Sequence, residues 1–261
     1  MRALAFLAGS LLAMTVQAQE PVRLHAAGSL RVALNEVISN FSESKVEAVY
    51  GASGLLRDRI AKGEPAEVFA SANLEHPQSL ETAGKAGPVR LFARNQLCAL
   101  AAPHVKVETG SLLERMLDPA VKLGTSTPKA DPSGDYAFEL FAKAEALRPG
   151  ARAALEGKAL KLTGGPGSPS PPKDRSLYEM LVADGKADVF LTYCTNALLA
   201  QKANAALRIV QLPAALAVGA DYGLTVLKGA RPQAANFAQF ILSQPGQAIL
   251  AKHGFGAGDP P

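Results

Sequence analysis

The chain has 261 residues, of which 48% are hydrophobic and 19% charged, and its formal net charge is +4 at pH 7. This composition is typical of a globular protein, and so small a net charge gives no basis for nucleic-acid binding. The length suits one large domain or two smaller ones with separate cores.

The N-terminus has the features of a secretory signal peptide. Arg2 supplies a positive charge, residues 3–14 form a short apolar run, and Val16-Gln17-Ala18 places small residues at the usual cleavage positions. The run is shorter than the roughly 20 residues that span a bilayer. We therefore expect cleavage after Ala18 and export to the periplasm, without a lipid anchor, because no cysteine follows the cleavage site.

Short β-rich runs alternate with helical stretches along the rest of the chain. The first half is predicted to contain strands at 22–26, 45–50, 67–71 and 97–102, and helices at 30–41, 55–62 and 77–86. The second half is predicted to contain strands at 122–124, 159–162, 189–193 and 221–226, and helices at 111–117, 136–147, 177–183, 234–242 and 247–252. This alternation predicts parallel strands with helices packed on both faces. The Gly/Pro-rich tail at 254–261 is expected to fray.

Residues 164–172 read Gly-Gly-Pro-Gly-Ser-Pro-Ser-Pro-Pro. Such a stretch forms neither a helix nor a central strand. It is either an ordinary surface loop or a loop that rims a cleft just before the next helix, and the sequence leaves both interpretations open.

Small and hydroxyl residues are concentrated at four places where a helix is expected to begin, at 26–30, 51–55, 131–136 and 172–177. A helix start leaves backbone amides unpaired and carries the positive end of the helix dipole. Small residues let an anion approach those amides, and a serine adds a hydroxyl donor. Ser and Asp are also ordinary capping residues, so capping alone explains any single junction. Together the four junctions indicate several neutral donors converging on one anion.

The same segments resemble, in order, the signatures of periplasmic molybdate-binding proteins. They are Ala26-Ala27-Gly28-Ser29-Leu30, Gly51-Ala52-Ser53-Gly54-Leu55-Leu56 with the following 60–72, Asp131-Pro132-Ser133-Gly134-Asp135-Tyr136-Ala137, Thr192-Tyr193-Cys194-Thr195-Asn196-Ala197, and 248–255. Each motif is weak alone, but the ordered set covers nearly all of the mature chain. The resemblance implies an α/β fold of the type II periplasmic binding protein class. This is a two-lobed clamshell in which each lobe is a mostly parallel sheet flanked by helices, and hinge strands join the lobes.

Domain boundaries follow from this resemblance. Residues 1–18 would be the signal peptide, 19–101 plus 222–258 lobe I, 102–221 lobe II, and 259–261 a tail. The resemblance also implies an inner-membrane ABC permease as the partner of the closed, loaded form. We expect a monomer that catalyses nothing and needs no cofactor.

The resemblance implies a ligand site of neutral donors between the lobes. Ser29 and Ser53 would give hydroxyl and amide donors from lobe I, and the backbone near Ser133 and Arg175 would give amides from lobe II. Tyr193 would give a phenol donor near the hinge. The implied ligand is molybdate or tungstate, held through its oxygens with no direct metal ligands from the protein.

Some residues depart from the family pattern. Ser133 stands where a small residue such as Ala is usual, Asn196 replaces Asp, and Gly28 replaces Ala. Arg175 falls where an apolar residue commonly supplies its amide. Its guanidinium either forks onto an anion or faces solvent beside Asp174. These changes leave the identity of the oxyanion open.

The chain has two cysteines, Cys98 and Cys194. Export permits a disulfide, although two buried free thiols are also common. The resemblance places both cysteines on strands near the hinge and therefore implies that they are bonded.

Three other functions share some of these sequence features. A binding protein of the same fold for sulfate, phosphate or a small organic anion differs only in cleft dimensions that sequence does not resolve. A secreted hydrolase is disfavoured because His25, His76, His104 and His253 lack metal-ligand spacing and Ser53 is not in a Gly-x-Ser-x-Gly elbow. A cytoplasmic effector-binding domain of a regulator shares this fold, but the signal peptide argues against it.

Overall fold

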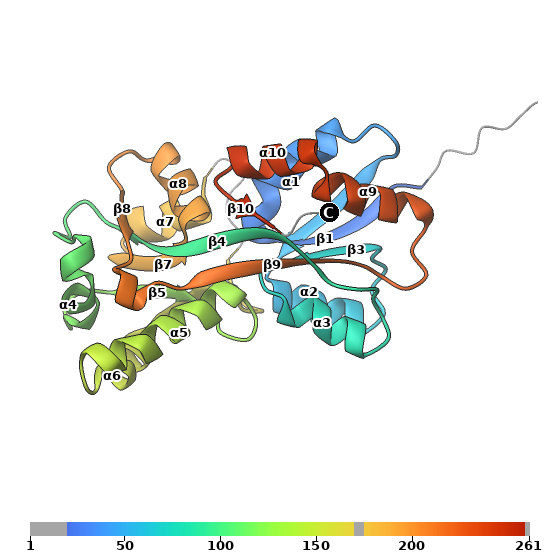
Figure 1. Ribbon diagram of the computed structural model, residues 1–261. Helices are drawn as coiled ribbons and strands as arrows, with labels where there is room; N and C mark the ends of the chain where they lie inside the picture. The colour runs from blue at the N-terminus through green and yellow to red at the C-terminus, as the bar shows by residue number, and fades with distance from the viewer. Residues whose placement is uncertain (1–19, 170–174, 259–261) are drawn as a thin grey trace, which may run out of the picture.

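The computed structural model describes residues 20–169 and 175–258, so the predicted signal peptide at 1–18 and the tail at 259–261 lie outside the described residues. Two α/β lobes share one ten-stranded sheet, whose main path has the order β2-β1-β3-β9-β4-β7-β5-β6 (Figure 1). The expected two-lobed α/β architecture is therefore confirmed. None of the helices in the described ranges is long and apolar enough to cross a membrane.

Lobe I is built around three parallel strands. Its strands are β1 (Val22–Ala27), β2 (Val46–Gly51) and β3 (Val68–Ser71), and the two-residue strand β10 (Gly256–Ala257) is added beside β4. One face is covered by α1 (Arg31–Asn40), α9 (Pro232–Leu242) and α10 (Gln244–Lys252), and the other by α2 (Ser53–Ala61) and α3 (Glu75–Thr82) (Figure 1). Because helices cover both faces, β1 is buried almost throughout, as expected for a central parallel strand.

Lobe II repeats the plan with different elements. Its strands are β5 (Leu123–Ser126), β6 (Leu160–Thr163), β7 (Val189–Tyr193) and β8 (Arg208–Gln211). Its helices are α4 (Leu112–Leu117), α5 (Pro132–Leu147), α6 (Ala151–Lys158), α7 (Leu177–Ala183) and α8 (Cys194–Ala203). Strands β5, β6 and β7 are parallel. Short 3-10 turns lie at Gly28–Leu30, Thr109–Ser111 and Ala214–Leu216.

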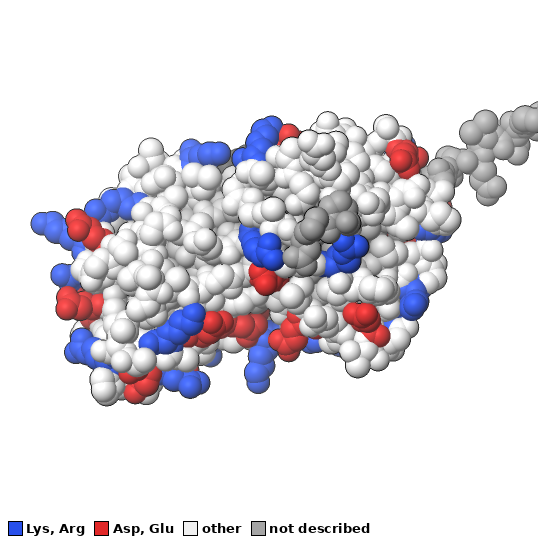
Figure 2. Space-filling view, viewed as in Figure 1, with Lys and Arg blue, Asp and Glu red and all other residues white. Residues whose placement is uncertain are grey.

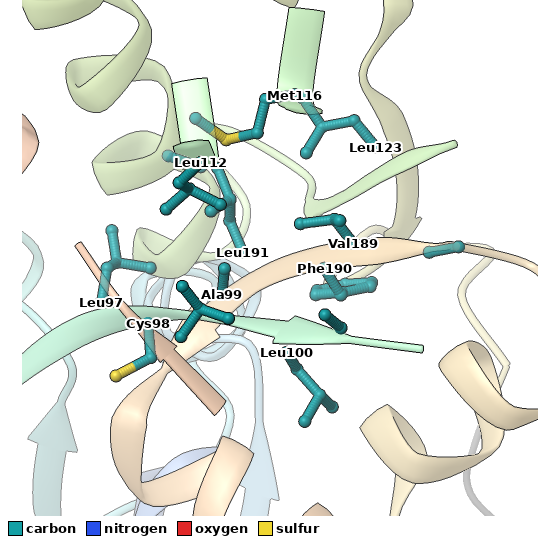
Figure 3. Packing of buried hydrophobic residues seen from close by; sticks show 14 of the residues in the cluster. Leu97, Cys98, Ala99, Leu100, Leu112, Met116, Leu123, Val189, Phe190 and Leu191 are labelled. Atoms are coloured by element: carbon teal, nitrogen blue, oxygen red, sulfur yellow. The ribbon is translucent and has the colours of Figure 1, made fainter. Parts of the chain in front are cut away.

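Two antiparallel strands connect the lobes. The first half of β4 (Arg90–Ala101) pairs with β9 (Gly219–Val226), which also pairs with β3 of lobe I. The second half of β4 pairs with β7 and β8 of lobe II. Figure 3 shows Leu97, Ala99 and Leu100 of β4 packed beside Phe190 and Leu191 of β7 in the lobe II core. One strand thus contributes to both lobes.

Several sequence predictions of elements were incomplete. Helices α6 and α8 and strand β8 were not predicted, and β4 begins at Arg90 rather than at residue 97. Helix α8 follows β7 with no intervening loop, so no turn signal marks its start. The expected fraying of the tail was wrong for Gly256 and Ala257, because both pair with β4.

Cys98 and Cys194 are joined by a disulfide, and their Cα atoms lie 4.9 Å apart. Cys98 belongs to β4, and Cys194 is the first residue of α8. The bond therefore links the crossing strand to the end of β7, where lobe II begins.

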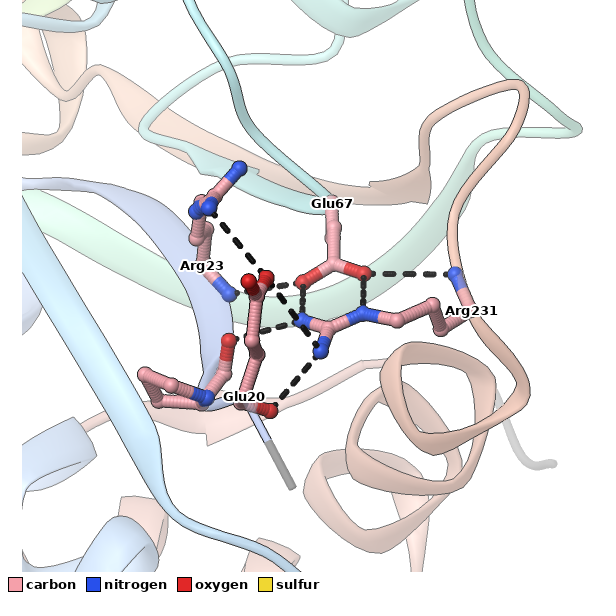
Figure 4. Close-up of polar contacts among 5 residues, drawn as sticks. Glu20, Arg23, Glu67 and Arg231 are labelled. Carbon is pink, nitrogen blue, oxygen red and sulfur yellow. Dashed lines mark hydrogen bonds and ion pairs between the residues drawn. The ribbon is translucent and has the colours of Figure 1, made fainter. Parts of the chain in front are cut away.

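A buried carboxylate ties the start of β1 to α9. Glu67 receives two side-chain hydrogen bonds from the Arg231 guanidinium and one from its backbone N–H, and the backbone N–H of Arg23 donates to the same carboxylate (Figure 4). Arg231 also donates to the carbonyls of Glu20 and Pro21. Chiefly because of the Arg231 hydrogen bond, the pKa of Glu67 falls to about 2. The ionised form is thereby stabilised by about 2–3 kcal/mol in the folded state.

We predict that this stabilisation is lost in acid. The pKa of Glu67 is lowered on folding, so its contribution is complete above the ordinary carboxyl pKa and disappears as pH falls toward 2. Glu67→Gln should lower the free energy of unfolding by about 2–3 kcal/mol at pH 7 and by almost nothing near pH 2. Urea titrations across this range measure the difference. Glu47→Gln, on the exposed side of edge strand β2, serves as the control. An equal effect of Glu67→Gln at both pH values would contradict the assignment.

Candidate ligand-binding site

A cleft of about 540 Å³ lies where the two lobes meet. Lobe I lines it with the ends of β1 and β2 and the starts of α1 and α2. Lobe II lines it with the end of β6 and the residues that follow, and with residues at the starts of α5, α7 and α8. Charged side chains of both signs are interspersed on the face shown in Figure 2, so no field of one sign dominates that face. Recognition of a ligand therefore depends on groups inside the cleft.

Ser29 and Ser53 come together at the cleft. They follow β1 and β2, which run parallel with Ala27 opposite Gly51, so both strands end at the same edge of the sheet. The Ser29 Oγ lies 3.0 Å from the Tyr222 hydroxyl. The Ser53 Oγ accepts a hydrogen bond of 3.1 Å from the backbone N–H of Ala72 and retains its own hydrogen for donation.

Tyr193 reaches the cleft from lobe II. It is the last residue of β7, it is 2% exposed, and its hydroxyl has no hydrogen-bond partner among the described residues. Its ring packs between those of Tyr136 and Tyr222, with centroids 6.3 and 5.6 Å away. Burial raises the pKa of Tyr193 well above its ordinary value, so the hydroxyl keeps its proton. A buried donor without a partner beside a cleft indicates a ligand or water that it serves.

Ser133 stands behind the cleft wall rather than in it. The residue is fully buried in the first turn of α5, and its Oγ has no hydrogen-bond partner within the described part of the chain. Its backbone N–H donates to Asp131 Oδ1 at 3.1 Å, and the N–H of Gly134 donates to the Asp131 carbonyl at 2.8 Å. The amides of Ser133 and Gly134, near which the resemblance assigned donors to the ligand, are thus already paired within the chain.

Asp131 is a cleft residue that the sequence analysis did not select. It caps α5, and it lines the cleft. Burial is the largest cause that raises the pKa of its carboxyl group, to about 6, and the Ser133 N–H partly offsets it. The Asp-Pro pair at a helix start was a clear capping signal, but nothing in the sequence showed that the carboxylate also faces a cleft.

Arg175 lines the cleft with its guanidinium engaged elsewhere. The group donates to both oxygens of Glu179 and both oxygens of Asp184, at 2.9 to 3.3 Å, which uses four of its five N–H groups. These carboxylates raise the pKa of Arg175. The Arg175 guanidinium, which could have bound an anion, is therefore bonded to two carboxylates of lobe II. Asp174, the other neighbour expected from the sequence, lies outside the described residues.

Arg31 is a second cleft residue that sequence reasoning missed. It is the first residue of α1, and its guanidinium carbon lies 4.6 Å from the centre of the Tyr50 ring. The cation therefore stacks on an aromatic face at the rim of the cleft. The described part of the Gly/Pro-rich segment also lies at this rim, since Gly164, Gly165 and Ser168 line the cleft.

The lobes touch directly on one side of the cleft. The backbone N–H of Gly54 in α2 donates to the carbonyl of Ala130 at 2.9 Å, and the Tyr136 hydroxyl donates to the carbonyl of Ala72 at 3.3 Å. A Cβ added to Gly54 would lie 2.8 Å from the Ala130 oxygen and closer still to that of Lys129. Only glycine admits this approach of the two backbones.

These features define a two-lobed binding protein with an interlobe ligand cleft. The chain belongs to the family of bacterial extracellular solute-binding proteins, whose model matches residues 22–256. This is a family of solute-binding transport proteins rather than of enzymes. A protein of Pasteurella multocida strain Pm70, described as uncharacterized protein PM1146, is 37% identical over 179 residues, which cover 67% of this chain and 74% of that protein.

Solved structures share the fold at low sequence identity. The sulfate-binding protein SubI of Mycobacterium tuberculosis H37Rv superposes with a TM-score of 0.76 at 21% identity, covering 93% of this chain and 88% of that one. The periplasmic molybdate-binding protein of Azotobacter vinelandii gives a TM-score of 0.70 at 18% identity, covering 90% and 98%. These likenesses establish the architecture and leave the ligand to the residues of the cleft.

We predict that Gly54→Ala prevents the lobes from meeting as they do here. The added methyl group would overlap the Lys129 and Ala130 carbonyls, which costs about 1–3 kcal/mol unless the lobes separate. Small-angle scattering should show a larger radius of gyration for this variant, with helix content unchanged. Gly157→Ala is the matched control, because a Cβ at this position in α6 has no neighbour within 4 Å. Identical scattering curves for Gly54→Ala and the wild type would refute the prediction.

Proposed function

We propose that the protein is a periplasmic binding protein that captures a small oxyanion in the interlobe cleft for an ABC permease of the inner membrane. One observation carries the proposal. Ser29, Ser53 and Tyr193, from three separate segments and both lobes, line one cleft, and the buried Tyr193 hydroxyl lacks a partner among the described residues. The family to which the chain belongs supports a small-molecule ligand.

Neutral donors suit this task because hydroxyl and amide groups carry no net charge, so the empty site needs no counter-ion. An oxyanion stripped of water needs a donor for each oxygen, and hydroxyls and amides at helix starts supply donors together with a favourable dipole. Ser53 begins α2, and Ser29 lies one turn before α1. Arg31 at the rim adds a positive charge that attracts anions to the opening.

Molybdate and tungstate are the first ligands to test, because the ordered motifs of the sequence resemble those of molybdate-binding proteins. The alternative ligand is another oxyanion or a small organic anion, and the volume of the cleft is consistent with this alternative. A five-atom anion fills only a small part of about 540 Å³, a volume in the range of sites for larger ligands.

A ligand panel tests the function. The purified mature protein is titrated by calorimetry with molybdate, tungstate, sulfate, phosphate and chromate. We expect at least one of these anions to bind with a dissociation constant near the micromolar range or below, and to raise the melting temperature accordingly. The absence of binding by every anion in the panel would overturn the proposal.

Removal of single donors should weaken binding of whichever anion is captured. Ser29→Ala, Ser53→Ala and Tyr193→Phe should each cost about 1–3 kcal/mol, the typical penalty for leaving a charged acceptor unpaired. Ser53→Ala also removes the acceptor of the Ala72 N–H, so its stability is measured in parallel. Ser39→Ala is the control, because Ser39 is exposed on α1 and bonds only to the carbonyl of Asn35. Wild-type affinity in all three variants would exclude these residues from the site.

A further inference from the structure

Asp131 is the one acidic residue among the described residues that line the cleft. Asp131 lines the cleft, its Oδ2 atom lies beside the lining residue Gly164, and none of the described Lys or Arg residues forms an ion pair with it. The nearby Arg175 is bound to Glu179 and Asp184 instead. A partly buried carboxylate in this position repels a bare anion and attracts a group that donates a hydrogen bond.

The backbone around Asp131 is shaped to hold its carboxyl group. One oxygen, Oδ1, accepts from the N–H of Ser133 at 3.1 Å, which fixes the side chain as the cap of α5. The other oxygen packs against Gly164, where an added Cβ would lie 2.7 Å from Oδ2. Gly164 also has a φ of +78°, which disfavours other residues. Two constraints at one position therefore reserve space for this oxygen beside the cleft.

The Ser133 N–H and the Ser126 hydroxyl favour the charged form of Asp131, but burial outweighs them and raises the pKa of its carboxyl group. Asp135 lies one turn further along α5 and is a like charge that raises the pKa of Asp131. Tyr178 of α7 and Tyr193 of β7 are close enough that the Asp131 charge adds to burial in raising their own pKa. Residues 164–169 of the facing loop contribute no titratable side chain. Among the described residues, the positive charges lining the cleft are Arg31 and Arg175.

We propose that the loaded site holds one proton between the Asp131 carboxyl group and an oxygen of the ligand, so that the cleft selects a hydrogen oxyanion. This inference depends on the oxyanion-binding function proposed above. A hydrogen oxyanion, such as a phosphate or phosphonate with one hydroxyl, brings that proton and donates it to the Asp131 carboxylate. A bare dianion such as sulfate binds only when Asp131 has taken up a proton from solvent and donates it to the anion.

The capping function alone predicts different behaviour. Asparagine caps helices as well as aspartate does, so Asp131→Asn should preserve the start of α5. The amide does not titrate, and it offers its own N–H₂ donor to a bare dianion. A merely structural Asp131 would therefore give the same pH dependence of binding in both forms.

The experiment compares sulfate and phosphate in the wild type, Asp131→Asn and Asp135→Asn between pH 5 and 8. Sulfate keeps its charge over this range, whereas phosphate always retains at least one hydroxyl. Asp135→Asn is the matched control, because Asp135 is on the same helix and bonds to the Lys129 N–H but does not line this cleft. Calorimetry in two buffers of different ionisation enthalpy counts the protons taken up.

For the wild type we expect sulfate affinity to fall as pH rises, since the pKa of Asp131 is about 6 and only its protonated form accepts the dianion. The loss should reach up to about a hundredfold at pH 8, with about one proton taken up per sulfate bound. Phosphate should bind more tightly than sulfate at pH 8. Asp131→Asn should bind sulfate independently of pH. Asp135→Asn should retain the slope, with its midpoint at lower pH because a like charge beside Asp131 is removed.

Sulfate profiles with the same slope in the wild type and Asp131→Asn would overturn this inference and leave the oxyanion function standing. Tighter binding of sulfate than of phosphate by the wild type at pH 8 would also overturn it. No binding of either anion, or of molybdate, at any pH would instead overturn the function on which the inference rests.

Discussion

Backbone pairing along β4 determines where every other part of the site can lie. Its first half is bonded to β9 beside lobe I, and its second half to β7 and β8 of lobe II. The parallel strands β1 and β2 end at one side of the junction, and β7 ends at the other. Ser29, Ser53 and Tyr193 lie at or just beyond these strand ends, so they face one cleft although they are far apart in sequence.

The cleft combines hydroxyl groups from both lobes with the Asp131 carboxylate, a set that no single helix start would supply. The start of α2 keeps the Ser53 hydroxyl available, whereas at the start of α5 the Asp131 carboxylate occupies the Ser133 amide. In the proposed complex, an anion would meet donors from lobe I and Tyr193, and an ionisable carboxyl group at the start of α5. The charge balance of that complex would then depend on the position of one proton, and a ligand's own hydroxyl would become part of its recognition.

Much of the fold was predictable because hydrophobic patterns and turn residues mark it locally. The alternation of strands and helices predicted parallel strands covered by helices, and the family resemblance added the two lobes. Ser29 and Ser53 stand at predicted helix starts, the resemblance added Tyr193, and the structure brings all three to the cleft. Other features depend on distant contacts. Asp131 looks like an ordinary helix cap until Gly164 is seen beside it. The pairing of Arg175 with Glu179 and Asp184 is local by contrast, four and nine residues along the chain, and sequence reasoning missed it. Helix α8 carries no start signal, because it continues directly from β7.

Contact between the lobes and the placement of Asp131 are consequences of the same turn. Ala130, whose carbonyl receives the Gly54 N–H, precedes Asp131, and Gly54 follows Ser53. Lys129 in this turn has a φ of 68°, a left-handed conformation that is costly for a residue with a side chain, and its N–H is held by Asp135 at 2.7 Å. Because the two backbones approach each other here, the Ser53 hydroxyl of lobe I and the Asp131 carboxylate of lobe II lie next to this contact, on opposite walls of the cleft. A ligand that bonds to both groups is stabilised only while the lobes are in contact. The proton proposed between Asp131 and the ligand would therefore stabilise the closed arrangement, and closure would in turn stabilise that proton.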